Sequence, residues 1–66
     1  MTLKDFLALI RTDECISIYD TQGNIYLCQE ICKGDYHGDY DNCVVTRITT
    51  NTTSFYYPVL ELEVVV

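Results

Sequence analysis

The sequence predicts an α+β domain in which a short N-terminal helix packs on a mainly antiparallel sheet of about four strands. Three observations indicate this fold class. Apolar residues near the N-terminus recur with helical spacing, those that follow alternate with a period of two, and β-branched residues dominate the C-terminal third. With 66 residues in all, the chain has room for one small domain, so residues 1–66 are expected to fold as a single unit.

The expected helix begins after Thr2. Large apolar side chains share one helical stripe at the spacing i, i+3, i+4 and i+7: Leu3, Phe6, Leu7 and Ile10. Thr2 can cap the helix, and Asp5 at the third helical position is a variant of the capping box that also suits the positive end of the helix dipole. Thr12 and Asp13 are poor helix formers, so we expect the helix to end before them.

A β-hairpin is expected over residues 15–29, with its turn at residues 20–24. The alternation places one set of apolar side chains on the face toward the core: Ile16, Ile18, Ile25 and Leu27. Pairing Ile18 with Ile25 sets Cys15 beside Cys28. A slip of one residue is excluded because it would mix the two faces, whereas a slip of two residues, and with it the cysteine pairing, remains open.

Two further strands are expected, at about residues 43–50 and 54–66. The third strand should direct Val44, Thr46 and Ile48 to one face and Val45, Arg47 and Thr49 to the other. The fourth should be irregular at Pro58, which cannot donate a hydrogen bond to the sheet. Its residues should alternate between the helix side and solvent, with Leu60, Leu62 and Val64 toward the helix and Glu61 and Glu63 outward.

The C-terminal residues Val64, Val65 and Val66 are apolar on both faces of this strand, which fits either a strand covered on both sides within the chain or an oligomer interface covered by another subunit. Fraying of Val65 and Val66 is the open alternative.

Charge restricts the class of partner. Ten acidic residues against four basic ones give a net charge of −6, which disfavours direct binding to nucleic acid or to an anionic membrane and favours a basic protein. The sequence shows no basic signal region, and the apolar run at residues 6–10 is too short for a membrane span. We therefore expect a cytoplasmic protein with reduced cysteines.

An acidic, tyrosine-rich segment follows the hairpin: Gly34-Asp35-Tyr36 recurs as Gly38-Asp39-Tyr40, with His37 between the two and Asp41 after them. We interpret it as a surface for a partner, made by Asp35, Tyr36, His37, Asp39, Tyr40 and Asp41. Tyr40 is expected to anchor the segment on the core. For Tyr36, packing and an interface both remain open.

Metal binding and catalysis are disfavoured. Cys28, Cys32, His37 and Cys43 lack the spacing of a structural zinc site, and the aspartates do not match a calcium loop. His37 with a cysteine nucleophile would be a chance combination of residue types, since no phosphate-binding loop, nucleophile elbow or zinc-protease motif is present. We expect no enzyme, no cofactor and no metal.

The capped helix at residues 1–7, the strand at residues 16–20, Gly23-Asn24-Ile25-Tyr26, and Asp41 and Val44 leading into a β-rich end resemble small acidic, uncharacterised proteins of Firmicutes phages and prophages. The Gly-Asp-Tyr doublet departs from that pattern, because such proteins tend to have a more aliphatic, often helical, connection there. The resemblance implies an antagonist of host defence, of which anti-CRISPR proteins that occupy nucleic-acid-binding clefts are examples.

The leading hypothesis is therefore a non-catalytic inhibitor of a basic host defence or nucleic-acid-handling protein, with Asp35, Asp39 and Asp41 standing in for phosphates. Two alternatives remain open. One is an oligomeric sponge that sequesters a nucleotide signal, and the other is a structural or regulatory accessory subunit.

Overall fold

A computed structural model describes residues 1–22, 25–52 and 57–66 of the chain. Its elements are α1 (Leu3–Leu7), β1 (Cys15–Asp20), β2 (Tyr26–Cys32), the 3-10 turn η1 (Lys33–Asp35), β3 (Val44–Thr52) and β4 (Pro58–Val65). The strands form one sheet in the order β2-β1-β4-β3. Neighbours pair antiparallel except for β1 and β4, which are parallel. The predicted fold class, one N-terminal helix on a mainly antiparallel sheet, is confirmed.

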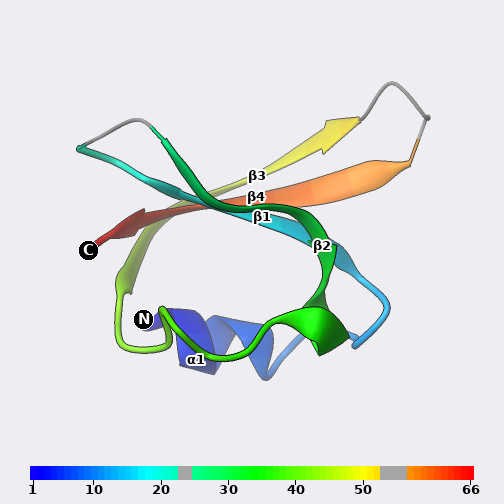
Figure 1. The fold of residues 1–66 in the computed structure, drawn as a ribbon, viewed down its shortest axis with the longest axis horizontal. Coiled ribbons are helices and arrows are strands. Elements are labelled where there is room, and N and C mark those ends of the chain that lie inside the picture. The colour runs from blue at the N-terminus through cyan, green and yellow to red at the C-terminus, as the bar shows by residue number, and fades with distance from the viewer. Residues whose placement is uncertain (23–24, 53–56) are drawn as a thin grey trace.

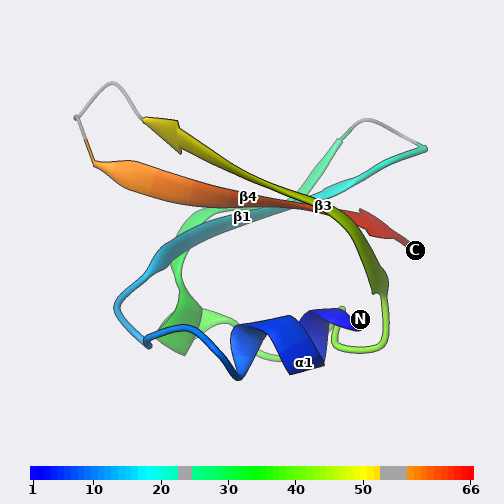
Figure 2. The same ribbon diagram turned by 180° about the vertical axis from the view of Figure 1, so that it is seen from behind.

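The sheet has one covered face and one open face. α1, η1 and the segment that leads to β3 lie beneath the sheet in Figure 1, and no described element lies above it. The view from behind shows the same arrangement (Figure 2). We call the face toward α1 the inner face and the opposite one the outer face.

The helix begins as its sequence predicts. The N–H of Asp5 donates to the Thr2 hydroxyl at 3.3 Å, which satisfies one of the backbone donors that a helix start leaves without a partner. Regular helix ends at Leu7. Backbone bonds tie this end of the chain to the residues around the start of β3, from the N–H of Leu3 to the carbonyl of Cys43 at 2.8 Å and from the N–H of Val45 to that of Met1 at 2.9 Å.

The core lies between α1 and the inner face. Its buried members are Leu3, Leu7, Ile16, Ile18, Leu62 and Val64. Phe6, Ile10 and Leu60 are partly buried against them, so the inward pattern of β4 is confirmed. The apolar stripe faces the core as predicted, but α1 ends at Leu7, short of the predicted end before Thr12, so Ile10 lies beyond the helix. Burying a side chain of this kind contributes roughly 1.5–3 kcal/mol, which makes the cluster the main source of stability in so small a domain.

The predicted pairing of Ile18 with Ile25 is wrong, and near the turn the strands take the slip of two residues that the sequence left open. Tyr19 lies opposite Tyr26, Ile18 opposite Cys28, Ile16 opposite Ile31, and Cys15 opposite Cys32. Ile25 was expected in the core but is 58% exposed and precedes β2, whereas Ile31 packs on the core in the second strand. The hairpin therefore extends to Cys32, beyond the predicted end at residue 29.

Two register shifts in this strand pair move the pairing further from the predicted one toward Cys15 and Cys32. From Ile16 to Ile18, β1 advances by two residues while β2 advances by three, from Cys28 to Ile31, so β2 carries an extra residue. Glu30 lies in this bulge with φ of 50°, and its N–H donates to the Ser17 hydroxyl at 2.9 Å. Ser17 is only 1% exposed, so the bulge satisfies a buried polar side chain.

A third shift changes the faces of β3. Between Val45 and Arg47 the strand gains one residue relative to β4. Val45 therefore pairs with Val64 and packs on the core, which contradicts its predicted place on the same face as Arg47 and Thr49. The strand continues to Thr52, and Pro58 begins β4 instead of interrupting it. Residues 54–56 of the predicted fourth strand lie outside the described residues.

Candidate binding surfaces

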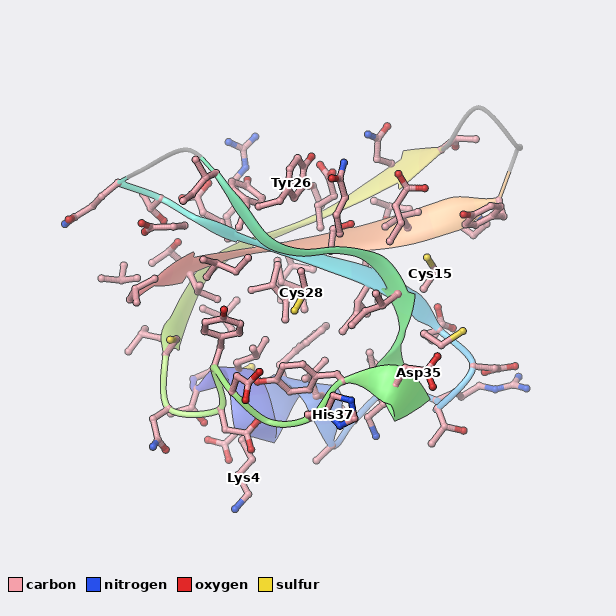
Figure 3. The ribbon with its side chains drawn as sticks, in the orientation of Figure 1. Lys4, Cys15, Tyr26, Cys28, Asp35 and His37 are labelled. Atoms are coloured by element: carbon pink, nitrogen blue, oxygen red, sulfur yellow. The ribbon has the colours of Figure 1, made fainter. Side chains whose placement is uncertain are left out.

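The outer face carries a cluster of tyrosines and glutamates that comes from distant parts of the chain. Parallel pairing of β1 and β4 sets Tyr19 beside Glu63, and the phenol of Tyr19 donates to the Glu63 carboxylate at 3.0 Å. The hydroxyl of Tyr26 in β2 donates to the carboxylate of Glu61 at 2.8 Å. Figure 3 shows Tyr26 on the open side of the sheet, away from α1.

The two tyrosines hold each other in place. Their rings meet edge to face, with centroids 5.8 Å apart and an angle of 62° between the ring planes. Hydrogen bonding to Glu61 and burial raise the pKa of Tyr26, while burial and the bond to Glu63 raise that of Tyr19. Both phenols are therefore neutral donors at physiological pH.

Glu63 lies at the centre of this network. Besides Tyr19, the hydroxyls of Thr21 and Thr46 each lie 3.1 Å from its Oε1 atom. The bond from Tyr19, together with those from the threonines and the nearby charge of Arg47, lowers the pKa of Glu63 although burial opposes the shift. The carboxylate is thus ionised, oriented and presented to solvent.

The outer face carries more acidic than basic side chains. Glu30 adds a third carboxylate, which accepts a hydrogen bond from the phenol of Tyr57 at 3.3 Å. Against these three, β3 provides one cation, Arg47, on the same face beside Glu63. We call Tyr19, Tyr26, Glu30, Glu61 and Glu63 the outer-face cluster.

The predicted site at residues 35–41 lies on the other side of the molecule, beside α1. Backbone bonds fasten its start, from the N–H of Lys33 to the carbonyl of Glu14 at 2.8 Å and from the N–H of Gly34 to that of Thr12 at 2.9 Å. A side chain at Gly34 would meet the Thr12 oxygen at 3.3 Å, so the close approach of the two segments favours glycine.

Both tyrosines of the segment anchor it. Tyr36 and Tyr40 pack against the core, and the Tyr36 hydroxyl accepts the N–H of Tyr40 at 2.7 Å. Burial, reinforced by a hydrogen bond to Asp41, raises the pKa of Tyr36 strongly. The Tyr36 phenol is therefore engaged within the chain, and the Tyr40 ring is partly covered by the core.

The polar residues of the segment differ in their exposure to solvent. Asp35, His37 and Asp39 are exposed. Asp41 is half-buried, and its carboxylate lies against Gly38, whose φ of 90° suits glycine. The structure thus leaves two of the three predicted aspartates at the surface and turns the third inward.

A hollow of about 480 Å³ lies between α1 and this segment. Its lining comprises Lys4, Leu7, Ala8, Lys33, Gly34, Tyr36, His37, Gly38 and Asp41. Two of the four basic residues of the chain and its single histidine therefore line the same hollow, and neither lysine forms an ion pair with a described residue. Figure 3 shows His37 on the segment and Lys4 on the helix below it, with the end of the lysine side chain directed away from His37. Sequence reasoning missed this cluster because Lys4 and Lys33 lie in separate elements.

The predicted oligomer interface is only partly accessible. Val64 is completely buried in the core of its own chain, whereas Val65 is 39% and Val66 71% exposed. An interface at this end stays a prediction for Val65 and Val66 alone.

Within residues 1–22, 25–52 and 57–66, no three His, Cys, Asp or Glu side chains gather in a way that could hold a metal ion. No helix in the same part of the chain is long and apolar enough to cross a membrane. Comparison of the chain with protein-family models, with curated proteins and with solved structures gave no match.

Proposed function

We propose that this chain is a non-catalytic binding protein that engages a basic protein partner through the outer-face cluster. The observation that carries the proposal is the arrangement of two paired tyrosines and three carboxylates on an open sheet face with a single arginine. Tyrosine provides a large contact area at a low entropic cost, and complementary charge selects and steers a basic partner.

The outer face suits this role better than residues 35–41 do. Its side chains stand on paired strands and are oriented by hydrogen bonds, so they lose little freedom when a partner binds. Tyr36 and Tyr40, by contrast, are already packed against the core. The resemblance to phage proteins makes a host defence or nucleic-acid-handling protein the expected partner, with the glutamates occupying positions that phosphates would take.

An arginine-rich peptide is a defined probe of this surface. In an NMR titration at low salt, we expect the largest shifts at Tyr19, Tyr26, Glu61 and Glu63, and weaker binding at higher salt. Glu30, Glu61 and Glu63 changed together to lysine should weaken binding at least tenfold. The matched control changes Asp35, Asp39 and Asp41 to lysine, which alters the net charge equally and should retain more of the affinity.

Circular dichroism checks that both triple variants fold, and Glu61→Gln provides a milder test should the first one unfold. Loss of binding in the aspartate variant alone would move the site back to residues 35–41. Equal loss in both variants would show that only the overall charge matters, and either result would overturn the outer-face assignment.

A second candidate function, sequestration of a nucleotide, is favoured by the hollow beside α1. Its lining includes Lys4 and Lys33, which carry the positive charge that a phosphate needs, in a chain that is otherwise acidic. Its volume of about 480 Å³ falls within the range of small-molecule sites, which is roughly 300–1,000 Å³. Asp41, on the same lining, opposes an anion.

Calorimetry with cyclic AMP and with inorganic pyrophosphate tests this candidate. Lys4 and Lys33 changed together to glutamine should abolish the heat of binding. Arg11 and Arg47 changed to glutamine remove the same charge elsewhere and should leave it intact. Absence of binding by the unaltered protein, or equal losses in the two double variants, would remove the candidate. Light scattering measures whether the binding species is an oligomer.

A further inference from the structure

Cys15 and Cys32 lie directly opposite each other at the end of the β1–β2 pair. The next residues outward, Glu14 and Lys33, are joined by a backbone hydrogen bond of 2.8 Å from the Lys33 N–H to the Glu14 carbonyl. Antiparallel pairs alternate between hydrogen-bonded and non-hydrogen-bonded positions, so the cysteine pair occupies a non-hydrogen-bonded position. Side chains approach each other most closely there.

This position has the dimensions that a disulfide needs. Directly opposite residues point to the same face, and Cα atoms at a non-hydrogen-bonded position are typically about 4.5 Å apart. Disulfides bridge Cα separations of about 4.4–6.8 Å. The two thiols can therefore join without a shift in the register of the strands.

The other two cysteines are placed differently. Cys28 pairs with Ile18, and both Cys28 and Cys43 are partly buried against the core. Figure 3 shows Cys28 directed toward the helix side and Cys15 on the other side of the sheet. Cys32 is exposed and Cys15 is half-buried, so an oxidant in solution reaches Cys32 first.

We propose that Cys15 and Cys32 form an oxidisable dithiol, a modification site that closes as an intramolecular disulfide when a disulfide oxidant such as oxidised glutathione is present. The Cys32 thiolate attacks one glutathione sulfur and breaks the glutathione S–S bond, and the first glutathione thiolate leaves. The Cys15 thiolate then attacks the Cys32 sulfur of this mixed disulfide and displaces the second glutathione thiolate. Two protein thiols lose two electrons to the oxidant, and their two protons end on the glutathione thiols.

The Cys15 thiol ionises less readily than an ordinary thiol. Burial raises the pKa of the Cys15 thiol, and the neighbouring charges of Cys32 and Glu30 act in the same direction. Cys15 therefore resolves the mixed disulfide instead of starting the reaction, and the rate of closure should rise with pH.

Closing the bond joins the two ends of the hairpin. The cross-link restricts the unfolded chain over residues 15–32, so the oxidised protein should melt at a higher temperature than the reduced one. The pair adjoins the outer-face cluster through Glu30, whose charge acts on the Cys15 thiol and whose carboxylate accepts the hydrogen bond from Tyr57. The proposal does not depend on the function of that face.

The test is oxidation of the folded protein by oxidised glutathione, followed by alkylation of free thiols, digestion and mass spectrometry. We expect Cys15 and Cys32 to escape alkylation together, the protein to lose the mass of two hydrogen atoms, and dithiothreitol to restore both thiols. Cys28→Ser is the matched control and should oxidise at the rate of the unaltered protein.

Cys32→Ser should abolish closure, and Cys15→Ser should stop the reaction at a glutathione adduct on Cys32. Circular dichroism of each reduced variant shows that it is folded. Pairing through Cys28 or Cys43, covalent dimers through Cys32, or an adduct in the unaltered protein that never closes would each overturn the proposal.

Discussion

The two faces of the sheet differ although the same strands build both. On the inner face, Ile16, Ile18 and Leu62 are completely buried and contact other apolar side chains. One residue along β4 from Leu62, Glu63 lies on the outer face and accepts hydrogen bonds from hydroxyl groups. Contacts on the inner face stabilise the fold, and the fold in turn positions the side chains of the outer face. Substitutions on the two faces should therefore affect stability and binding separately.

Energies of the two kinds of contact differ accordingly. Burial of one large aliphatic side chain stabilises by about 1.5–3 kcal/mol. A hydrogen bond that replaces contacts with water contributes about 0.5–1.5 kcal/mol, and exposed polar pairs contribute less. Changes on the inner face should therefore act first on the free energy of unfolding, and changes on the outer face first on affinity.

The largest expected effect is that of Leu62→Ala. Removing a completely buried leucine leaves a cavity and should lower the free energy of unfolding by about 2–5 kcal/mol, measured by urea denaturation. A domain of 66 residues has only about 3–10 kcal/mol in total. Ile48→Ala is the matched control, because Ile48 lies opposite Leu62 in β3 but is 45% exposed.

Ile48→Ala should cost about 1 kcal/mol or less. Equal losses in the two variants would contradict the assignment of the core to the region beneath β1 and β4.

An intermediate effect is expected for Tyr36→Phe. The variant removes the hydroxyl that accepts the Tyr40 N–H at 2.7 Å, and should lower the free energy of unfolding by about 1 kcal/mol. Tyr26→Phe also deletes a phenol hydroxyl, but from the outer face, and should leave stability nearly unchanged while weakening binding of the arginine-rich peptide. A larger loss of stability in Tyr26→Phe than in Tyr36→Phe would reverse the comparison between the two faces.

The smallest effect concerns pH. The pKa of Glu63 in the folded protein lies below its ordinary value of 4.5. The ionised carboxylate therefore stabilises the fold when the pH is above 4.5. This contribution should be lost as the pH falls through the folded pKa. The melting temperature of Glu63→Gln should therefore decline less between about pH 5 and pH 3 than that of the unaltered protein.

Thr21→Val combined with Thr46→Val should raise the pKa of Glu63, measured by NMR titration of its side chain. An unchanged titration in this double variant would show that the threonine hydroxyls do not act on the carboxylate.

Parts of the fold could be predicted because their signals are local. The cap at Thr2 and the alternation of Leu60 and Leu62 depend only on neighbours in the sequence, and both predictions were correct. The error at Ile25 has a different origin. Near the turn the strands pair two residues away from the predicted register, a slip that alternation with a period of two cannot detect. Farther along, the bulge at Glu30 depends on a hydrogen bond to Ser17 across the strand pair.

The acidic segment at residues 35–41 was visible in the sequence, but the packing of Tyr36 was not. Whether a tyrosine faces solvent or core depends on how the segment crosses α1, and backbone bonds from Lys33 and Gly34 to residues before β1 position it.

By itself, the sequence determined the helix, the existence of the strands, the inward side of β4 and the acidic charge, because periodicity and composition act within a few residues of chain. Tertiary structure alone decided that β1 and β4 are neighbours and which residues of β1 and β2 lie opposite each other. The parallel pairing of β1 with β4 brings Tyr19 to Glu63, and the bulged register of β2 brings Cys15 to Cys32. Such pairings rest on the summed packing of the whole core, which local patterns do not encode.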